Sequence, residues 1–361
     1  MSNLFLEVLE LLAVLAAIML LSIDLSRLFR KDEALSKTKY LPKTLVIIPC
    51  KGMDISLYQN LLALKNQSYK RYEVIAVVDS ENDEAMPQIK KAGISYIISN
   101  IRSRRASGKV KAIASALKSF RNYEAYVIAD SDITVNRSWL SSIIAPLSDK
   151  NIGISTTYPR FQPIGGFWPK VKMVWNFVGE NLLENPSSRF AWGGTMAFRK
   201  DLMGQKEQLY LINSKYSVSD DITITKICKR KGMGIAYVKE AQPVVNTNDS
   251  FEQFIEWSNR QTALTFLGYS NNFKRGMFFY CSEIFVMISA SLLSIYVSLI
   301  FLLLFAHLAV NWKRSYARAK SSDPAIALIV ILIPFIYAYN LISARMMKRI
   351  TWRGATYLLH Q

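Results

Sequence analysis

The triplet Asp130-Ser131-Asp132, directly after the apolar run at residues 126–129, has the residue types and spacing of a metal and phosphate site. Its two carboxylates are hard oxygen ligands of the kind that Mg²⁺ and Mn²⁺ prefer. An ion held there would stabilise the negative charge that develops on a departing nucleotide. An ordinary turn is the alternative, because Asp and Ser favour turns through local hydrogen bonds. The triplet therefore predicts a site for Mg²⁺ or Mn²⁺ with a diphosphate, with the turn left open.

A second pair of acids, Asp220 and Asp221, stands directly before an expected helix at residues 222–231. A carboxylate at this position could act as the general base that takes the proton of an acceptor hydroxyl. The same residues could simply cap the helix. The helix dipole would keep the acid ionised, whereas a crowded, partly desolvated pocket would raise its pKa. Both interpretations stay open from the residues alone.

Further residues could contact the rest of a nucleotide. Pro49 and Lys51 follow one expected strand, and Asp79 ends the next, where it could bind a base or a ribose or only form a turn. Lys109 begins an expected helix at residues 109–120, and helix N-termini bind anions. The other basic residues nearby form a cationic supply for phosphates, most of them solvated: Arg102, Arg104, Arg105 and Lys111.

Two glycine-containing segments also invite a functional interpretation. The segment 192–196 contains Gly193 and Gly194, and glycine would let the backbone approach a ligand closely. The segment 165–175 mixes two glycines with Trp168 and Trp175. It could form an acceptor cleft at the level of lipid headgroups or an amphipathic helix that packs its rings inward. Histidine-based catalysis is not expected, because the only histidines lie in or near the apolar C-terminal part.

The segments that must position these residues are short β-rich runs at 44–48, 73–78, 94–98 and 126–129, separated by helix-length intervals. This alternation predicts right-handed crossovers and a mostly parallel, doubly wound α/β sheet. Polar clusters follow three of the runs. Because ligands bind beyond the carboxyl ends of parallel strands, the three clusters are expected to meet at one site.

Three long apolar stretches indicate membrane association. Residues 277–310 and 325–342 each reach the roughly 17 to 25 residues that a spanning helix needs. Residues 4–25 form a third candidate, for which an amphipathic surface helix is the alternative because it contains Glu7, Glu10 and Asp24. Basic residues follow this first stretch and none precede it, which predicts an uncleaved anchor with the next domain on the cytoplasmic side.

The chain is strongly basic, with 45 Lys and Arg against 27 Asp and Glu and a net charge of +18. This balance suits anionic lipid, nucleic acid or phosphorylated substrates. Nucleic acid is disfavoured, because the basic segment 102–111 contains no interleaved aromatic residues. Cys50, Cys228 and Cys281 lack metal-ligand spacing and are expected to be free thiols.

Taken together, several motifs occur in the order found in a known family. They are Lys51-Gly52-Met53-Asp54, Asp79, Asp130-Ser131-Asp132, Gly193-Gly194, Asp220-Asp221, a Trp-bearing helix before the membrane and Thr351-Trp352-Arg353-Gly354. Over roughly residues 40–355 the set resembles the ceramide glucosyltransferase type of inverting, membrane-bound GT-A glycosyltransferases. The joint pattern is far more specific than any single motif.

The resemblance implies a GT-A catalytic domain and a role for each acid. Asp79 would contact the nucleotide, Asp130 and Asp132 would hold the metal and diphosphate, and Asp221, beside Asp220, would be the general base. The base would activate a lipid hydroxyl that attacks the anomeric carbon opposite the departing nucleoside diphosphate, which inverts the configuration. No covalent glycosyl-enzyme would form.

This sequence departs from the family at one position. The family usually carries Gln or Arg, two residues and then Arg-Trp, whereas this sequence has Glu256 directly before Trp257. Arg260 lies four residues beyond Glu256, so on a helix it would project from the same face. We therefore expect Arg260 to supply the cation that the leaving diphosphate needs.

The expected organisation is a transmembrane anchor at residues 1–30, a GT-A domain at 31–250, an interfacial amphipathic segment at 251–276, transmembrane helices at 277–345 and a basic cytoplasmic tail at 346–361. The expected function is transfer of a sugar from a nucleotide donor, UDP-hexose, to a lipid at the cytoplasmic face of the cell membrane. A polysaccharide synthase is the nearest alternative, although it would need more spans. A second alternative is a non-catalytic basic membrane scaffold, which would not explain the acids at the ends of three strands.

Overall fold

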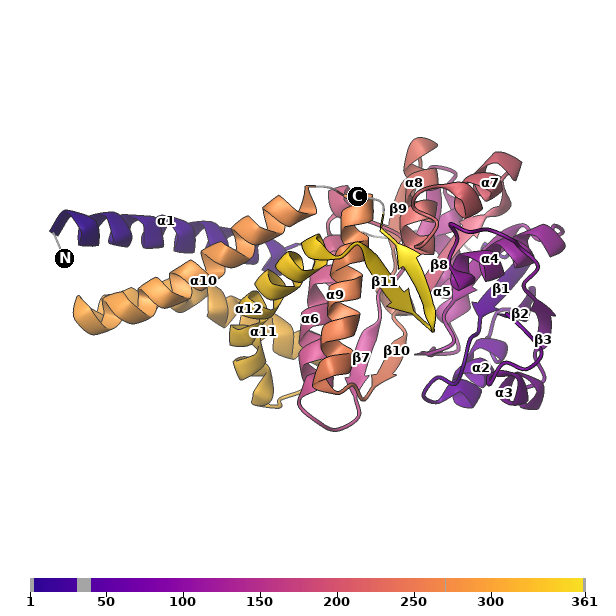
Figure 1. Ribbon diagram of the computed structural model, residues 1–361, viewed down its shortest axis with the longest axis horizontal. Helices are drawn as coiled ribbons and strands as arrows, with labels where there is room; N and C mark the ends of the chain where they lie inside the picture. The colour runs from indigo at the N-terminus through magenta and orange to yellow at the C-terminus, as the bar shows by residue number, and fades with distance from the viewer. Residues whose placement is uncertain (1–2, 31–39, 270, 360–361) are drawn as a thin grey trace. The chain divides into compact units, whose positions relative to one another are not determined.

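The computed structural model describes residues 3–30, 40–269 and 271–359 (Figure 1). Among the basic residues that follow the first apolar stretch, Lys31, Lys37 and Lys39 lie outside the described part. The chain forms two compact units, each built from separate stretches. A helical unit comprises Met1–Asp32, Gly165–Asn181 and Asn248–Met347. An α/β unit comprises Glu33–Ile164, Leu182–Thr247 and Lys348–Gln361.

A seven-stranded sheet organises the α/β unit, in the order β3-β2-β1-β4-β8-β6-β9. Its strands are β1 (Thr44–Pro49), β2 (Tyr72–Val78), β3 (Ser95–Ile98), β4 (Ala125–Ala129), β6 (Ile152–Thr156), β8 (Thr195–Arg199) and β9 (Gly234–Tyr237). Only β8 runs against its two neighbours, β4 and β6. The four expected strands correspond to β1, β2, β3 and β4, which pair in parallel, so the predicted doubly wound α/β fold is confirmed.

Helix α4 shows why this unit folds as the sequence pattern indicates. It extends over Gly108–Ser119 and begins at the N-cap Ser107, whose hydroxyl accepts a hydrogen bond from the Val110 amide. Ile113 and Leu117 are fully buried on one face of the helix against the apolar residues of β1 and β2. Each such side chain contributes about 1.5–3 kcal/mol of burial free energy, which fixes α4 on the sheet.

The remaining elements of the α/β unit connect and flank this sheet. Its other helices are α2 (Leu57–Lys65), α3 (Met86–Lys91), α5 (Trp139–Ile144), α7 (Gln205–Asn213), α8 (Asp220–Arg230) and the 3-10 turns η1 (Ala145–Ser148), η2 (Pro186–Ser188), η3 (Lys200–Leu202) and η4 (Lys239–Ala241). A small sheet joins β5 (Ile133–Thr134), β10 (Val244–Thr247) and β7 (Arg160–Pro163). The expected tail is a hairpin of β11 (Arg349–Trp352) and β12 (Ala355–Leu358).

The helical unit contains the apolar stretches. Its elements are α1 (Asn3–Leu28), most of α6 (Trp168–Glu184), α9 (Phe251–Gly268), α10 (Asn272–Tyr296), η5 (Leu299–Phe305), α11 (Ala306–Ala319) and α12 (Ala325–Met346). Within the described residues, three helices are long and apolar enough to cross a membrane: Leu4–Leu28, Asn272–Tyr296 and Ala325–Met346. Small residues of α1, Ala13 and Ala17, pack with Val286 and Ala290 of α10, as close helix contacts in membranes require.

Two segments of the helical unit settle questions that the sequence left open. The expected apolar stretch at 277–310 is not one helix, because Val297 and Ser298 are non-helical and Ser298 caps η5 through the Ile300 amide. In α6, Trp175 is buried and stacks on Tyr337 of α12 with 4.9 Å between ring centroids. The aromatic residues of this segment therefore pack inward, as the amphipathic-helix interpretation expected.

Candidate active site

The polar clusters after β1, β2 and β4 meet at the carboxyl edge of the sheet. These three strands are neighbours and run parallel, so Pro49 at the end of β1, Asp79 after β2 and Asp130 after β4 emerge side by side. Lys51 Nζ lies 2.9 Å from Asp79 Oδ2, in an ion pair that is half-exposed. A Cβ added to Gly108 would lie 3.8 Å from the same oxygen, which places Asp79 beside the start of α4.

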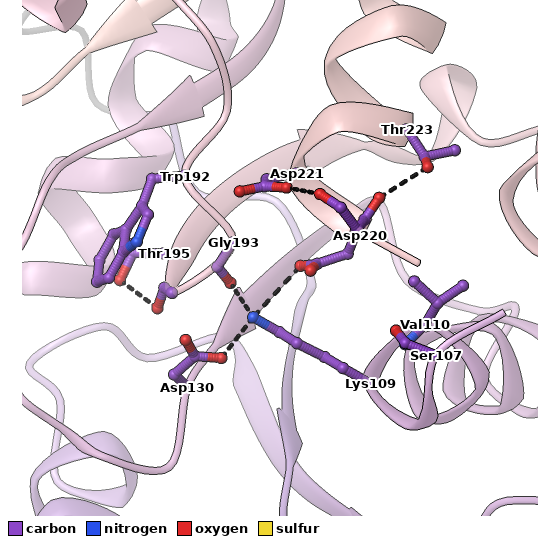
Figure 2. Close-up of polar contacts among 12 residues, drawn as sticks. Ser107, Lys109, Val110, Asp130, Trp192, Gly193, Thr195, Asp220, Asp221 and Thr223 are labelled. Atoms are coloured by element: carbon purple, nitrogen blue, oxygen red, sulfur yellow. Dashed lines mark hydrogen bonds and ion pairs between the residues drawn. The ribbon is translucent and has the colours of Figure 1, made fainter. Parts of the chain in front are cut away.

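Lys109, the second residue of α4, holds its ammonium group among three oxygens (Figure 2). Nζ lies 2.6 Å from Asp130 Oδ1 and donates to the Gly193 carbonyl at 3.0 Å. Nζ also lies 3.4 Å from Asp220 Oδ2. This contact is an ion pair without a hydrogen bond, because Asp220 Oδ2 accepts no hydrogen bond within the described part of the chain. Burial lowers the pKa of Lys109, but the Asp130 and Asp220 carboxylates outweigh it and raise the pKa. Lys109 is therefore a permanent cation between the triplet and α8.

Gly193 leaves the room in which the charged ends of Asp220 and Lys109 lie. A Cβ there would meet Asp220 Oδ2 at 2.8 Å and Lys109 Nζ at 3.0 Å, so a larger residue would displace these two side-chain ends. The neighbouring Gly194 holds the triplet through its carbonyl, which accepts a hydrogen bond from the Asp130 amide at 3.0 Å. A Cβ at Gly194 would clash with the Trp192 ring, and the expected approach of this backbone to a ligand stays a prediction.

The middle residue of the triplet fixes its conformation. The Ser131 hydroxyl donates to Asp54 Oδ2 at 2.5 Å, and the Ser131 carbonyl accepts from Asn60 Nδ2 at 3.0 Å. Asp54 belongs to the loop after β1, so the loops after two neighbouring strands are locked together. Ser131 is thus more than a spacer between two acids.

The third residue of the triplet, Asp132, lies in a strongly negative environment. Burial, together with the carboxylates of Asp130 and Asp54, raises the pKa of Asp132 to about 7. Burial also raises the pKa of Asp130, against which Lys109 acts. Carboxylates crowded in this way resist simultaneous ionisation unless a cation joins them.

The residues present fit a divalent cation whose remaining ligands come from the substrate. In the described part of the chain, no three His, Cys, Asp or Glu side chains form a group able to hold a metal by themselves. Mg²⁺, however, is usually held by one or two carboxylates plus substrate phosphates rather than by a cage of protein ligands. Asp130 and Asp132 supply that pair, and the crowding of the buried Asp132 carboxylate with those of Asp130 and Asp54 favours an added positive charge.

The two acids at the start of α8 differ in environment. Asp220, the first residue of the helix, is buried and faces Lys109 (Figure 2). Asp221 accepts hydrogen bonds from the Ser219 hydroxyl and from the Ile222 amide. Burial and the neighbouring Asp220 charge nevertheless raise the pKa of Asp221 to about 6. The crowded pocket therefore outweighs the helix dipole at Asp221.

An arginine from the far end of the chain also reaches this edge. Arg353 Nη1 donates to the Lys51 carbonyl at 2.9 Å, and Nη2 pairs with Asp54 Oδ1. Burial works against the charge, but Asp54, Asp132 and Asp130 outweigh it and raise the pKa of Arg353. Sequence reasoning singled out neither Arg353 nor Asp54 as a site residue, although both stood within the recognised motifs.

Trp257 and Arg260 lie on α9, in the helical unit. Arg260 Nη1 lies 3.9 Å from Glu256 Oε1, which confirms that the two share a helix face. The Trp257 ring packs against Trp175, with centroids 5.0 Å apart, and Lys172 Nζ lies 4.6 Å from its centre. Their expected roles toward the leaving group stay predictions.

Comparison with known proteins agrees with this geometry. The sequence profile of glycosyl transferase family 21 matches residues 9–361. The mannosyltransferase PcManGT from Pyrobaculum calidifontis, solved with GDP-Man and Mn²⁺, is similar with a TM-score of 0.56 and 16% identity, over 94% of this chain and 96% of that one. Glucosyl-3-phosphoglycerate synthase from Mycobacterium tuberculosis, solved with Mn²⁺, UDP and glucosyl-3-phosphoglycerate, is similar with a TM-score of 0.41 and 13% identity, over 62% of this chain and 79% of that one. The first likeness shows a GT-A fold.

Proposed function

Because the chain belongs to glycosyl transferase family 21, and is therefore a glycosyltransferase, we propose that it transfers a hexose from a UDP-linked donor to a membrane lipid with inversion. The single observation that carries the proposal is the bridge formed by Lys109 between Asp130 and Asp220. It joins the acid expected at the donor diphosphate to the acid pair expected at the acceptor hydroxyl. This bridge supports a site in which both halves of a displacement reaction share one sheet edge.

On the donor side, Asp79 binds the nucleoside and Lys51 holds that carboxylate in place. Asp130 and Asp132 would hold Mg²⁺ or Mn²⁺, which when bound offsets the charge that develops on the departing diphosphate. Mn²⁺ in the PcManGT structure supports this assignment. Gly194 and Ser131 keep the triplet in position through their hydrogen bonds.

On the acceptor side, Asp221 takes the proton of the lipid hydroxyl. A pKa of about 6 suits a base that must be ionised near neutral pH yet retain proton affinity. Asp220 stays paired with Lys109 beside Asp221. Attack of the activated hydroxyl opposite the departing nucleoside diphosphate inverts the anomeric configuration in one step.

The proposed acceptor is a lipid, and the proposed location is the cell membrane with the catalytic unit in the cytoplasm. Three helices with the length and composition of membrane spans support this location. The basic residues that follow the first apolar stretch support the cytoplasmic orientation. Arg260 is assigned to the leaving diphosphate in place of the family arginine that is absent at Glu256, with Trp257 beside it on α9.

Full-length protein in detergent, given Mn²⁺ and a panel of UDP- and GDP-linked hexoses, tests the proposal. We expect one donor to release nucleoside diphosphate and EDTA to abolish the release. Formation of a long polymer instead of a glycolipid would favour a polysaccharide synthase. Absence of both donor binding and release across the panel would favour the basic membrane scaffold.

A further inference from the structure

The C-terminal hairpin β11–β12 contacts both sides of the candidate donor site. It starts three residues after α12 ends at Met346. On one side, Arg353 donates to the Lys51 carbonyl at 2.9 Å and pairs with Asp54. On the other side, the Tyr357 hydroxyl accepts a hydrogen bond from the Gly108 amide at 3.3 Å, at the start of the helix that carries Lys109. The hairpin is thus part of the site wall.

The turn of this hairpin places Arg353 in an unfavourable backbone conformation. Trp352 pairs with Ala355, so Arg353 and Gly354 form a two-residue turn, with φ angles of 50° and 75°. Such a turn needs positive φ at both positions and favours Asn followed by Gly. A side chain other than Asn, Asp or Gly is disfavoured there. The turn itself therefore does not explain an arginine, and strain of this kind points to a function of the side chain.

The charges around Arg353 indicate what it could bind. Within the described part of this cluster, five carboxylates surround two cations, Lys109 and Arg353; the acids are Asp54, Asp130, Asp132, Asp220 and Asp221. Three negative charges (5 minus 2) remain when all five are ionised, and one divalent ion would offset two of them. A diphosphate that arrived with the ion would add negative charge again, and Lys109 is already committed to two acids and a carbonyl.

We propose that Arg353 is a donor-binding residue, whose guanidinium pairs with the diphosphate of the nucleotide sugar beside Asp130 and Asp132. This inference rests on the proposed function and names a cation of the same site. A guanidinium presents several N–H groups in a planar fork that matches phosphate oxygens, which an ammonium cannot do. In the protein without donor, Asp54 holds Arg353 at the site.

The test measures binding of Mn²⁺ alone and of inorganic pyrophosphate with Mn²⁺ to full-length protein in detergent, by calorimetry. The variant is Arg353→Asn, because Asn suits the turn and removes the guanidinium together with its contacts to Lys51 and Asp54. We expect pyrophosphate with Mn²⁺ to bind about 10- to 100-fold more weakly, the loss of one or two charge-assisted hydrogen bonds. Mn²⁺ alone should bind equally or more tightly, because a competing cation has left the carboxylates.

Weaker binding of pyrophosphate without weaker binding of Mn²⁺ separates a binding role of Arg353 from a merely structural one. Arg353→Lys should restore part of the pyrophosphate affinity, and Arg349→Gln, a charge change at an exposed position of the same hairpin, should change neither measurement. If Arg353→Asn weakens both ligands equally, or neither, Arg353 does not bind the diphosphate. If the unaltered protein binds neither pyrophosphate with Mn²⁺ nor any nucleotide sugar, the proposed function fails as well, and the two failures are distinguishable.

Discussion

Lys109 Nζ lies 2.6 Å from Asp130 Oδ1, so the first acid of the triplet is paired with the helix that packs on the central strands. This pair joins the start of α4 to the loop that follows β4. The same ammonium reaches Asp220, which makes the geometry of the donor side depend on that of the acceptor side. A substitution at Asp130 is therefore expected to alter the position of Asp220, and a substitution at Asp220 that of Asp130.

Replacement of Lys109 by Met should destabilise the folded protein strongly. It would leave the buried Asp220 carboxylate and the Asp130 carboxylate without their cation, and removal of one partner from a buried pair costs about 3–5 kcal/mol. The thermal midpoint should fall by several degrees, measured by unfolding in detergent. Lys118→Met, at the exposed end of the same helix, is the control and should have little effect. Equal midpoints for the two variants would show that the bridge contributes nothing.

The transfer rate should depend on pH through Asp221. A base must be ionised to accept a proton, so kcat/KM should fall about tenfold for each pH unit below a pKa of about 6 and level off above it. The Ser219 hydroxyl lowers the pKa of Asp221, so Ser219→Ala should move the acid limb to higher pH. An acid limb that stays in place in this variant, in a pH series from 5 to 9, would argue against Asp221 as the base.

Stability should respond to pH and Mn²⁺ through Asp132. Its pKa is about 7 in the folded protein and 3.8 in the reference state, so the folded state retains a proton that the unfolded chain releases. Stability should therefore fall as pH rises from about 4 to 7. At pH 8, Mn²⁺ should raise the thermal midpoint of the unaltered protein, whereas Asp132→Asn should reduce the pH dependence, of which the raised pKa of Asp221 retains a part, and should remove the response to Mn²⁺. A Mn²⁺ response that survives in Asp132→Asn would contradict the assignment.

Asp79 should recognise the nucleoside and not the phosphates. Asp79→Asn removes a charge that Lys51 holds at 2.9 Å, and loss of hydrogen bonds to a charged group should weaken UDP binding about tenfold or more. The affinity for inorganic pyrophosphate with Mn²⁺ should not change. Glu81→Gln, an exposed neighbour, is the matched control. Equal losses for UDP and pyrophosphate would place Asp79 at the diphosphate instead.

Much of the fold and of the candidate site could be predicted from local patterns. The buried runs that became β1, β2 and β4 are short, β-rich and bounded by polar residues, and the rule for parallel strands then predicted that Asp79 and Asp130 would emerge at one edge. Helix α4 was equally evident from its apolar spacing.

Other features depend on contacts that no local pattern contains. Arg353 reaches the carbonyl of Lys51 across 302 residues of sequence, and only the tertiary fold brings them together. Lys109 was expected to bind phosphate, but the fold surrounds it with Asp130, Asp220 and the Gly193 carbonyl, which adds a positioning role. The helix end at Tyr296 lies inside a uniformly apolar stretch, where hydropathy gives no signal for a break.

The central claim is that donor binding and proton removal are carried by different acids of one site. It is tested most directly by transfer of radiolabelled hexose into the lipid phase by purified Asp221→Asn protein, under conditions in which it is saturated with donor and Mn²⁺. We expect donor affinity near that of the unaltered protein and labelled lipid reduced by at least about 100-fold, within the range typical of a lost general base. Labelled lipid at the level of the unaltered protein, or loss of donor binding together with transfer, would contradict the account.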